Sequence, residues 1–317
     1  MLRVLFLFVS TFLPLSSDML TRTQVIMSTF ISISVSEKYK DHIENGFEII
    51  KDVEDSLSSY KPSATVYKLN KNKYAKLDKY TYEALTLCQR YYKETNGYFD
   101  ISIGSITKDI YRFGEDEHLA SQDELNSAKI RFRALEYNTK YAYLDDGIKI
   151  DLGGMGKGYA VDKLAEYFKT NGIKDAIISA SGDIRCLGIC KIDIQDPFSD
   201  GALLSFTTTQ NDTGISTSGT YNRYIKNQEN NHLINPKLKK SQTKFVSITL
   251  VSKLASSDLD AYATAASVMP LNKAYEFLDS IEVAYIVVQS DGIIKKGGNL
   301  SLIVSDAVKK QPRYIHN

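Results

Sequence analysis

Residues 151–162 read Asp-Leu-Gly-Gly-Met-Gly-Lys-Gly-Tyr-Ala-Val-Asp and join a glycine-dense turn to the start of an amphipathic helix. Four of the six residues from 153 to 158 are glycines, which permit close approach to a ligand and positive φ angles. The helix start offers unpaired N–H groups that suit an anion such as a phosphate. The run matches neither G-x-G-x-x-G nor a Walker loop, so by itself it indicates a structural turn as much as a ligand site.

The spacing of apolar residues around this turn predicts both helices and strands. Val161, Leu164, Ala165 and Phe168 recur at i, i+3, i+4 and i+7, and Asn171-Gly172 ends that helix. Further helices are expected over 38–58, 80–95, 122–130, 258–268 and 272–279, and strands over 141–151, 175–180, 203–208, 245–251 and 283–289. Early helices and later interspersed strands predict an α+β fold, with helices packed around the interleaved strands of a mixed sheet.

The composition is that of a folded chain with balanced charge. Its 317 residues are 43% hydrophobic, enough for a substantial core. With 39 basic and 38 acidic residues it lacks the positive charge typical of nucleic-acid binding, so no nucleic-acid partner is expected. If the segment from Cys186 to Cys190 were one extended strand, the two Cα atoms would lie about 13 Å apart. We therefore expect two buried thiols there, with a disulfide as the alternative if the chain turns tightly at Gly188.

The first residues have the pattern of an export signal. Arg3 precedes the apolar stretch Val4–Leu15, which has the length of a signal-peptide core and is shorter than the about 20 residues that span a bilayer. We expect residues 1–17 to be a signal peptide that directs export to the periplasm and is cut near Ser17, with an uncleaved membrane anchor as the alternative. No cysteine lies near this segment, so lipoprotein attachment is not expected.

More motifs accompany the glycine turn in a fixed order. Downstream are Ser181-Gly182-Asp183-Ile184-Arg185, Thr217-Ser218-Gly219-Thr220-Tyr221, His232-Leu233-Ile234-Asn235-Pro236 and Asp260-Ala261-Tyr262-Ala263-Thr264. Upstream are Met27-Ser28-Thr29-Phe30, Ser59-Tyr60-Lys61-Pro62 and Asn96-Gly97-Tyr98-Phe99-Asp100. In this order the chain resembles the ApbE family of Mg²⁺-dependent FAD:protein FMN transferases, over residues 27–305, and the family's mixed architecture agrees with the expected fold. Ser28 departs from the family's glycine and Tyr98 from its usual small residue.

The last motif indicates a metal site. Asp260 and Thr264 are one helical turn apart, so the carboxylate and the hydroxyl project from the same face. Hard oxygen ligands of this kind suit Mg²⁺. The resemblance implies that these two side chains and a backbone carbonyl of the glycine turn, here that of Gly154, bind the metal. Without the resemblance, Asp260 is more simply a charge in the first turn of the helix and Thr264 a packing residue.

The resemblance also implies a flavin site. Tyr60 and Phe99 offer flat faces to the rings of FAD, and Lys157 offsets the charge of the pyrophosphate. In structural terms alone, Lys157 is equally well a solvated residue of the first helical turn and Met27 a core residue. The implied FAD contacts are Met27, Tyr60, Tyr98, Phe99, Asp100, Asp151, Lys157 and Ile234, with Gly182 and Asp183 lining the same cavity.

His232 is the expected catalytic residue. In the family the matching histidine is thought to assist deprotonation of the acceptor hydroxyl, and an ordinary imidazole pKa near 6.5 suits that role. Asn235 stands where many relatives have aspartate, which removes a carboxylate partner for the imidazole and leaves the orientation of His232 open.

The expected function is that of an exported Mg²⁺-dependent transferase. It would cleave the pyrophosphate of FAD, move FMN onto a threonine hydroxyl of a partner protein and release AMP. The resemblance implies membrane flavoprotein acceptors, such as subunits of sodium-pumping quinone reductases or related electron-transfer complexes at the inner membrane. The alternatives are hydrolysis of FAD to FMN and AMP, and a periplasmic flavin-binding carrier. Asp260 and Thr264 argue against the carrier, because binding a flavin requires no metal.

Overall fold

A computed structural model describes residues 12–14 and 19–305 of the chain. Its largest element is an eight-stranded sheet in which all neighbouring strands are antiparallel. The strands follow the order β16 (Ile294–Gly298), β15 (Ala284–Gln289), β14 (Phe245–Ser252), β11 (Thr213–Gly219), β8 (Asp183–Cys186), β7 (Ala176–Ala180), β3 (Thr29–Ser36) and β2 (Met19–Ile26).

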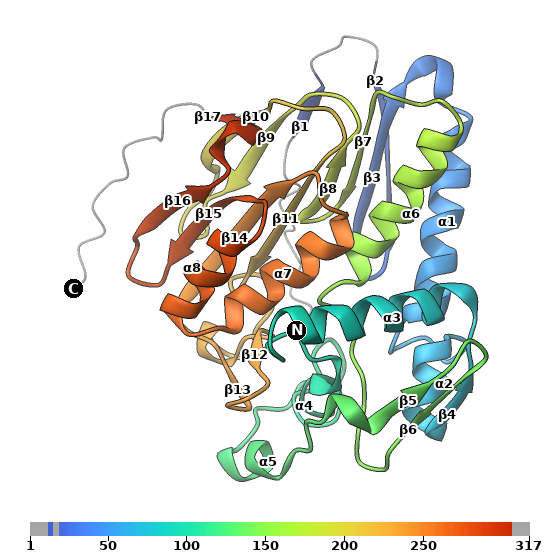
Figure 1. Ribbon diagram of the computed structural model, residues 1–317, viewed down its shortest axis with the longest axis vertical. Coiled ribbons are helices and arrows are strands. Elements are labelled where there is room, and N and C mark those ends of the chain that lie inside the picture. The colour runs from blue at the N-terminus through green and yellow to red at the C-terminus, as the bar shows by residue number, and fades with distance from the viewer. Residues whose placement is uncertain (1–11, 15–18, 306–317) are drawn as a thin grey trace.

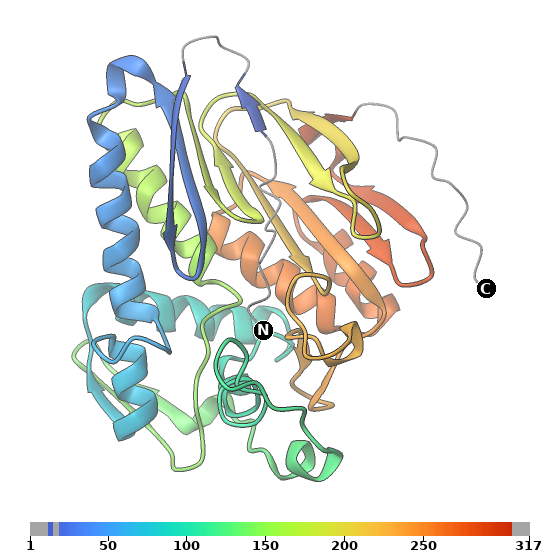
Figure 2. The same cartoon turned by 180° about the vertical axis from the view of Figure 1, so that it is seen from behind.

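Helices cover one face of this sheet and a second sheet covers part of the other (Figures 1 and 2). The helices are α1 (His42–Leu57), α6 (Gly156–Thr170), α7 (Ser256–Val268) and α8 (Leu271–Ser280). The second sheet has the order β1 (Phe12–Pro14), β9 (Cys190–Gln195), β10 (Ala202–Thr208) and β17 (Ile303–Ser305). This three-layer arrangement is an α+β fold, as the sequence predicts.

The remaining elements gather below the sheet in the view of Figure 1. They are α2 (Thr65–Asn72), α3 (Lys79–Glu94), α4 (Gly104–Thr107), α5 (Gln122–Ser127), the sheet of β4 (Tyr74–Lys76), β6 (Tyr141–Leu144) and β5 (Leu135–Tyr137), and the pair β12 (Ile234–Asn235) and β13 (Lys240–Ser241). Short 3-10 helices are η1 (Glu37–Tyr39), η2 (Ile101–Ile103), η3 (Phe132–Ala134), η4 (Gln228–Asn230) and η5 (Leu300–Leu302).

Two cores hold the layers together. In β14, Ile248 and Leu250 belong to the core beneath the helices, whereas Val251 belongs to the core between the two sheets. Side chains of a strand alternate between its faces, so one strand contributes to both cores. On α1 the apolar stripe of Ile43, Phe47, Ile50 and Leu57 is buried, and the apolar residues predicted for α6 are buried too.

The predicted strand over 141–151 is wrong beyond Leu144, where β6 ends. The next residues have other partners for their backbone groups. The buried Asn70 side chain donates to the carbonyl of Ile150 at 2.9 Å and accepts from its amide at 2.8 Å. The amide of Lys149 donates to the Ser105 hydroxyl, and that of Asp151 to the Ile101 carbonyl. Side chains and loop carbonyls therefore satisfy the backbone hydrogen-bonding groups of an apolar segment that resembles a strand in sequence.

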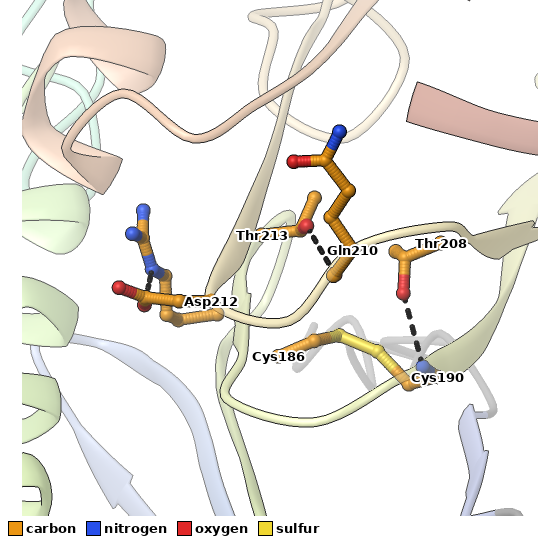
Figure 3. The surroundings of a disulfide bond; sticks show 7 residues. Cys186, Cys190, Thr208, Gln210, Asp212 and Thr213 are labelled. Atoms are coloured by element: carbon orange, nitrogen blue, oxygen red, sulfur yellow. Dashed lines mark hydrogen bonds and ion pairs between the residues drawn. A yellow bond between two sulfur atoms is a disulfide. The ribbon is translucent and has the colours of Figure 1, made fainter. Parts of the chain in front are cut away.

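The expectation of two free thiols at Cys186 and Cys190 is also wrong, because the structure joins them in a disulfide (Figure 3). β8 ends at Cys186 and β9 begins at Cys190, so the intervening residues turn and the two Cα atoms are 6.2 Å apart. A Cβ on Gly188 would lie 2.6 Å from Oδ1 of Asp175, so a larger residue there would push the Asp175 side chain aside. The alternative that depended on a tight turn at Gly188 is the correct one.

The predicted signal segment is described only in part. Residues 12–14 form β1, which pairs with β9, and the other residues of 1–17 lie outside the described part of the chain. Among the helices that the structure describes, none is long and apolar enough to cross a membrane.

A tight crossing of α6 and α7 positions the helix that carries Asp260 and Thr264. The residue before α7 is Ala255, which has no capping side chain. Asp162 of α6 takes that role, because its carboxylate accepts from the amides of Ser256 at 2.6 Å and Ser257 at 2.9 Å. At Gly158 the helices are so close that an added Cβ would lie 2.2 Å from the Ser256 carbonyl oxygen.

This crossing predicts different effects of alanine at two glycines of the same turn. Gly158→Ala should lower the free energy of unfolding by about 1–3 kcal/mol, because overpacking forces the backbone of α7 to move. Gly156→Ala is the matched control, since its nearest neighbour would be the Met27 methyl at 3.7 Å, an ordinary contact. Urea unfolding gives the free energy of unfolding of both variants. Equal unfolding midpoints would contradict the proposed role of the crossing.

Candidate functional site

The glycine turn is held by its own first residue. Oδ1 of Asp151 accepts from the amide of Gly153 at 3.0 Å, and the carbonyl of Leu152 accepts from the amides that begin α6. None of the four glycines of the turn adopts positive φ, so that expectation is wrong. Their value is close approach, because a Cβ on Gly154 would lie 2.9 Å from Cγ2 of Thr264.

Lys157, in the first turn of α6, joins two buried carboxylates. Its Nζ lies 3.1 Å from Oδ2 of Asp183 and 3.3 Å from Oδ2 of Asp260. Burial opposes its charge, but the two carboxylates raise the pKa of Lys157 above its ordinary value. Burial and the neighbouring Asp183 carboxylate raise the pKa of Asp260. The alternative of Lys157 as a merely solvated residue is therefore wrong.

The predicted metal-binding residues meet at the same place. Oδ2 of Asp260 accepts from the amide of Gly158 at 3.1 Å, and Thr264 lies against Gly154. Ser218 of β11 adds a second hydroxyl, 3.4 Å from that of Thr264. The site thus combines a carboxylate and two hydroxyls beside the backbone of the turn.

This donor set fits a hard cation. Oδ2 of Asp183 is buried, and apart from its ion pair with Nζ of Lys157 it has no hydrogen-bond partner among the described residues, so it has a lone pair to offer. Within residues 12–14 and 19–305, no group of three or more His, Cys, Asp or Glu side chains is placed to hold a metal. A cation here would depend on hydroxyl, backbone and water oxygens besides the carboxylates, which is the coordination that Mg²⁺ accepts.

A second cluster surrounds Tyr60. Its hydroxyl accepts from Nζ of Lys108 at 2.5 Å and from Arg223 at 2.8 Å, and it donates to the carbonyl of Phe113 at 2.8 Å. Lys108 also lies 3.3 Å from Oδ2 of Asp151. Burial opposes ionisation of Asp151, but the Lys108 ammonium and the hydroxyl of Thr107 lower the pKa of Asp151 to about 2. The glycine turn therefore contacts both clusters.

Three residues of these clusters were not predicted: Lys108, Arg223 and Ser218. Lys108 follows the short helix α4 in a stretch without a recognisable motif, so the sequence offered no signal for it. Ser218 lies inside a motif and Arg223 two residues after it. Both could have been proposed, since residues that flank a binding motif often belong to the same site.

His232 is held by the backbone. Its Nδ1 lies 3.1 Å from the carbonyl of Arg223, which also accepts from the His232 amide at 3.2 Å. A carbonyl only accepts, so Nδ1 carries the proton and Nε2 is left as an acceptor. Burial and the Arg223 guanidinium lower the pKa of His232 to about 3, so the imidazole is neutral at physiological pH.

Asn235 does not orient the imidazole. Its Nδ2 donates to the carbonyl of Val268 at 2.6 Å, and its Oδ1 accepts from the amides of Lys237 and Leu238. The orientation that the sequence left open is therefore supplied by the Arg223 carbonyl.

Two further predicted residues adjoin the glycine turn, and a third adjoins Asp183. The Met27 methyl faces Gly156, and a ring carbon of Phe99 would lie 3.4 Å from a Cβ on Gly154. Met27 and Ser28 both have positive φ and form the two-residue turn between β2 and β3. Gly182, next to Asp183, would clash with the carbonyl of Thr217 if it carried a Cβ.

The other predicted flavin contacts have structural partners. Nζ of Lys237 lies 4.1 Å from the centre of the Tyr98 ring. Oδ1 of Asp100 accepts from the amide and hydroxyl of Ser102 and caps η2. Ile234 is buried in an apolar cluster with Phe113. The part of these side chains in binding FAD stays a prediction.

Comparison with known proteins agrees with this geometry. The family model described as the ApbE family matches residues 27–287. An FAD:protein FMN transferase of Buchnera aphidicola subsp. Schizaphis graminum is 28% identical over 291 residues, which are 85% of this chain and 84% of that protein. The FAD:protein FMN transferase of Escherichia coli strain K12 is 24% identical over 293 residues, with 84% and 83% of the two chains covered.

Solved structures share the fold. The crystal structure of the ApbE protein from Thermotoga maritima superposes with a TM-score of 0.82 at 21% identity and covers 90% of this chain and 99% of its own. The flavin transferase ApbE from Vibrio cholerae gives a TM-score of 0.78 at 20% identity, with 90% and 98% covered. Because the family model spans most of the sequence and the solved structures have the same fold, the chain belongs to the ApbE family.

Proposed function

We propose that this protein is an FAD:protein FMN transferase that moves FMN from FAD onto a threonine hydroxyl of a partner protein and releases AMP. The observation that carries the proposal is the meeting of Lys157, Asp183, Asp260 and Thr264 at the glycine turn. The relatives named FAD:protein FMN transferase support it, because they match this chain over most of its length.

Mg²⁺ is the proposed metal, and Asp260, Thr264 and the backbone of Gly154 are its proposed ligands. Bound there, the ion would neutralise charge that develops on the pyrophosphate as its bond to the leaving AMP breaks. Lys157 already lies between two carboxylates. It can turn toward a phosphate oxygen once a divalent cation balances Asp183 and Asp260, so the lysine and the metal would share the charge of the substrate.

His232 is the proposed base. Its Nε2 is unprotonated and able to accept the proton of the incoming threonine hydroxyl. The negative charge of a bound pyrophosphate would oppose the effect of Arg223 and Lys157. It would thereby raise the pKa of His232 toward the ordinary 6.5 and strengthen it as a base. Tyr60, Phe99 and Met27 are the proposed apolar contacts of the flavin rings.

The metal prediction concerns Asp260. Asp260→Asn should reduce AMP release by at least about 10²-fold, because several kcal/mol of charge stabilisation are lost at about 1.4 kcal/mol per tenfold. FAD binding should largely survive, since the flavin contacts remain. Product analysis by mass spectrometry with FAD, Mg²⁺ and an acceptor measures the rate, with the exposed Glu276→Gln as control. Full turnover in Asp260→Asn would remove the proposed metal site.

The base prediction concerns His232. His232→Ala should slow FMN transfer about 10²- to 10⁴-fold, the loss typical of a general base, with FAD affinity little changed. His118→Ala, whose side chain pairs with Glu124 at the surface, is the matched control. The same assay without acceptor separates transfer from hydrolysis of FAD by water. Loss of FAD binding together with rate would make His232 a pocket residue instead.

We also propose that the protein is exported and acts on membrane flavoprotein subunits, such as those of sodium-pumping quinone reductases or related electron-transfer complexes. The apolar stretch Val4–Leu15 and the Cys186–Cys190 disulfide support export, because disulfides persist in oxidising compartments such as the periplasm.

Export is tested with residues 1–30 fused to a reporter that is active only outside the cytoplasm. The fusion should be active, and a matched fusion carrying Leu7→Asp and Val9→Asp should be silent, because charges interrupt the apolar core of the signal. A silent reporter on the unaltered fusion, with the protein accumulating in the cytosol, would refute export.

A further inference from the structure

Arg223 contacts the two sides of the site at once. Its guanidinium donates to the hydroxyl of Tyr60 at 2.8 Å and to the carbonyl of Phe113 at 3.1 Å. Its own carbonyl holds both the amide and Nδ1 of His232. One residue therefore fixes an aromatic side chain by its side chain and an imidazole by its main chain.

The loop around Arg223 links its side-chain contacts to the position of its backbone carbonyl. Tyr224 forms an antiparallel bridge with Asn231 across the loop. The residues just outside this bridge, Arg223 and His232, therefore lie opposite each other, with the Arg223 carbonyl facing His232. Asn231 is fully buried, and its side-chain Nδ2 donates to the backbone carbonyls of Gln228 and Gln242. Hydrogen bonds of a buried side chain thus hold the base of the loop together. On the other side of the loop, the Arg223 guanidinium attaches it to the Tyr60 hydroxyl and the Phe113 carbonyl.

We propose that Arg223 is a positioning residue for the transfer reaction, which couples the placement of Tyr60 to the orientation and protonation state of His232. The inference rests on the proposed function, in which Tyr60 contacts the flavin and His232 is the base. It adds a residue that sequence motifs did not indicate, and it predicts that flavin binding and base strength respond together to one substitution.

Charge supports this role. The charged groups that act on His232 are Arg223, Lys157 at the start of α6 and Asp151 of the glycine turn. Arg223 and Lys157 lower the pKa of the imidazole, as burial does, and Asp151 raises it. Removal of the guanidinium takes away one repulsive charge and the anchor of the loop whose backbone holds His232. Both changes raise the pKa toward 6.5, so the imidazole becomes protonated at mildly acidic pH.

Lys108 provides a matched comparison. It also donates to the hydroxyl of Tyr60, at 2.5 Å, and its ammonium lies 3.8 Å from the centre of the Tyr60 ring. It reaches Asp151 rather than the backbone that holds His232. A residue that only supports Tyr60 should behave like Lys108, whereas a residue that couples Tyr60 to His232 should also change the behaviour of the imidazole.

The experiment compares Arg223→Met and Lys108→Met with the unaltered protein. Both variants should bind FAD less tightly, by about 10- to 150-fold for a lost hydrogen bond to a charged group. Only Arg223→Met should show a kcat/KM that falls at acidic pH. The ratio of its value at pH 5.5 to that at pH 8 should fall by as much as about tenfold if the pKa of His232 reaches 6.5. Fluorescence of bound FAD and the rate of AMP release give the two readouts.

A third readout needs no turnover. The chain has four histidines, so the NMR titration of the His232 ring can be assigned with His232→Gln, and it should move to higher pH in Arg223→Met but not in Lys108→Met. An unchanged His232 titration in Arg223→Met, or an equal change in both variants, would overturn the proposal. Absence of AMP release and FMN transfer in the unaltered protein would refute the proposed function, while the titration still decides the coupling.

Should Arg223→Met not fold, Arg223→Gln carries the same expectation, because it keeps a hydrogen-bond donor for Tyr60 and removes the charge. Arg223→Gln should therefore retain more of the FAD affinity and still shift the titration of His232. Reduced FAD affinity with an unchanged pH profile in this variant would make Arg223 a flavin-pocket residue and overturn the coupling.

Discussion

The close packing of α6 on α7 at Gly158 is the constraint on which the site depends. A side chain as small as a methyl does not fit between this residue and the carbonyl of Ser256. The same contact lets the amide of Gly158 donate to Asp260. One turn further along α6, Asp162 caps α7. Two residues of one helix therefore fix both the distance and the direction of the other, and with them the carboxylate that we assign to the metal.

Charge is arranged in opposite senses on the two sides of the glycine turn. Asp183 and Asp260 outnumber Lys157 on one side, so a cation is attracted there when both carboxylates are ionised. Lys108 and Arg223 outnumber Asp151 on the other side, which attracts an anion. Buried charges are costly unless they are paired. The unequal pairing is thus a reason to expect that a metal and an anionic substrate complete the two clusters.

Local patterns of the sequence determined much of the fold. The apolar stripes of α1 and α6 and the buried run of β7 identify elements whose faces the structure buries, because amphipathic periodicity reflects which side meets the core. The errors arose where a local pattern has two physical solutions. Residues 147–151 look like a strand, but the side chain of Asn70, from a helix far away in sequence, takes the place of a neighbouring strand. Cys186 and Cys190 could have belonged to one strand or to a turn.

The family resemblance, the helical spacing of Asp260 and Thr264, and the glycine turn can all be read from the order of residues, because these are properties of neighbouring residues. The three-dimensional packing was needed to show that the glycines serve close approach rather than positive φ. It alone placed Lys108 and Arg223 on the hydroxyl of Tyr60 and gave His232 a backbone carbonyl as its partner. The physical reason is that such contacts join residues far apart in the chain, and no spacing along the sequence records which hydroxyl, carbonyl or charge will lie opposite in space.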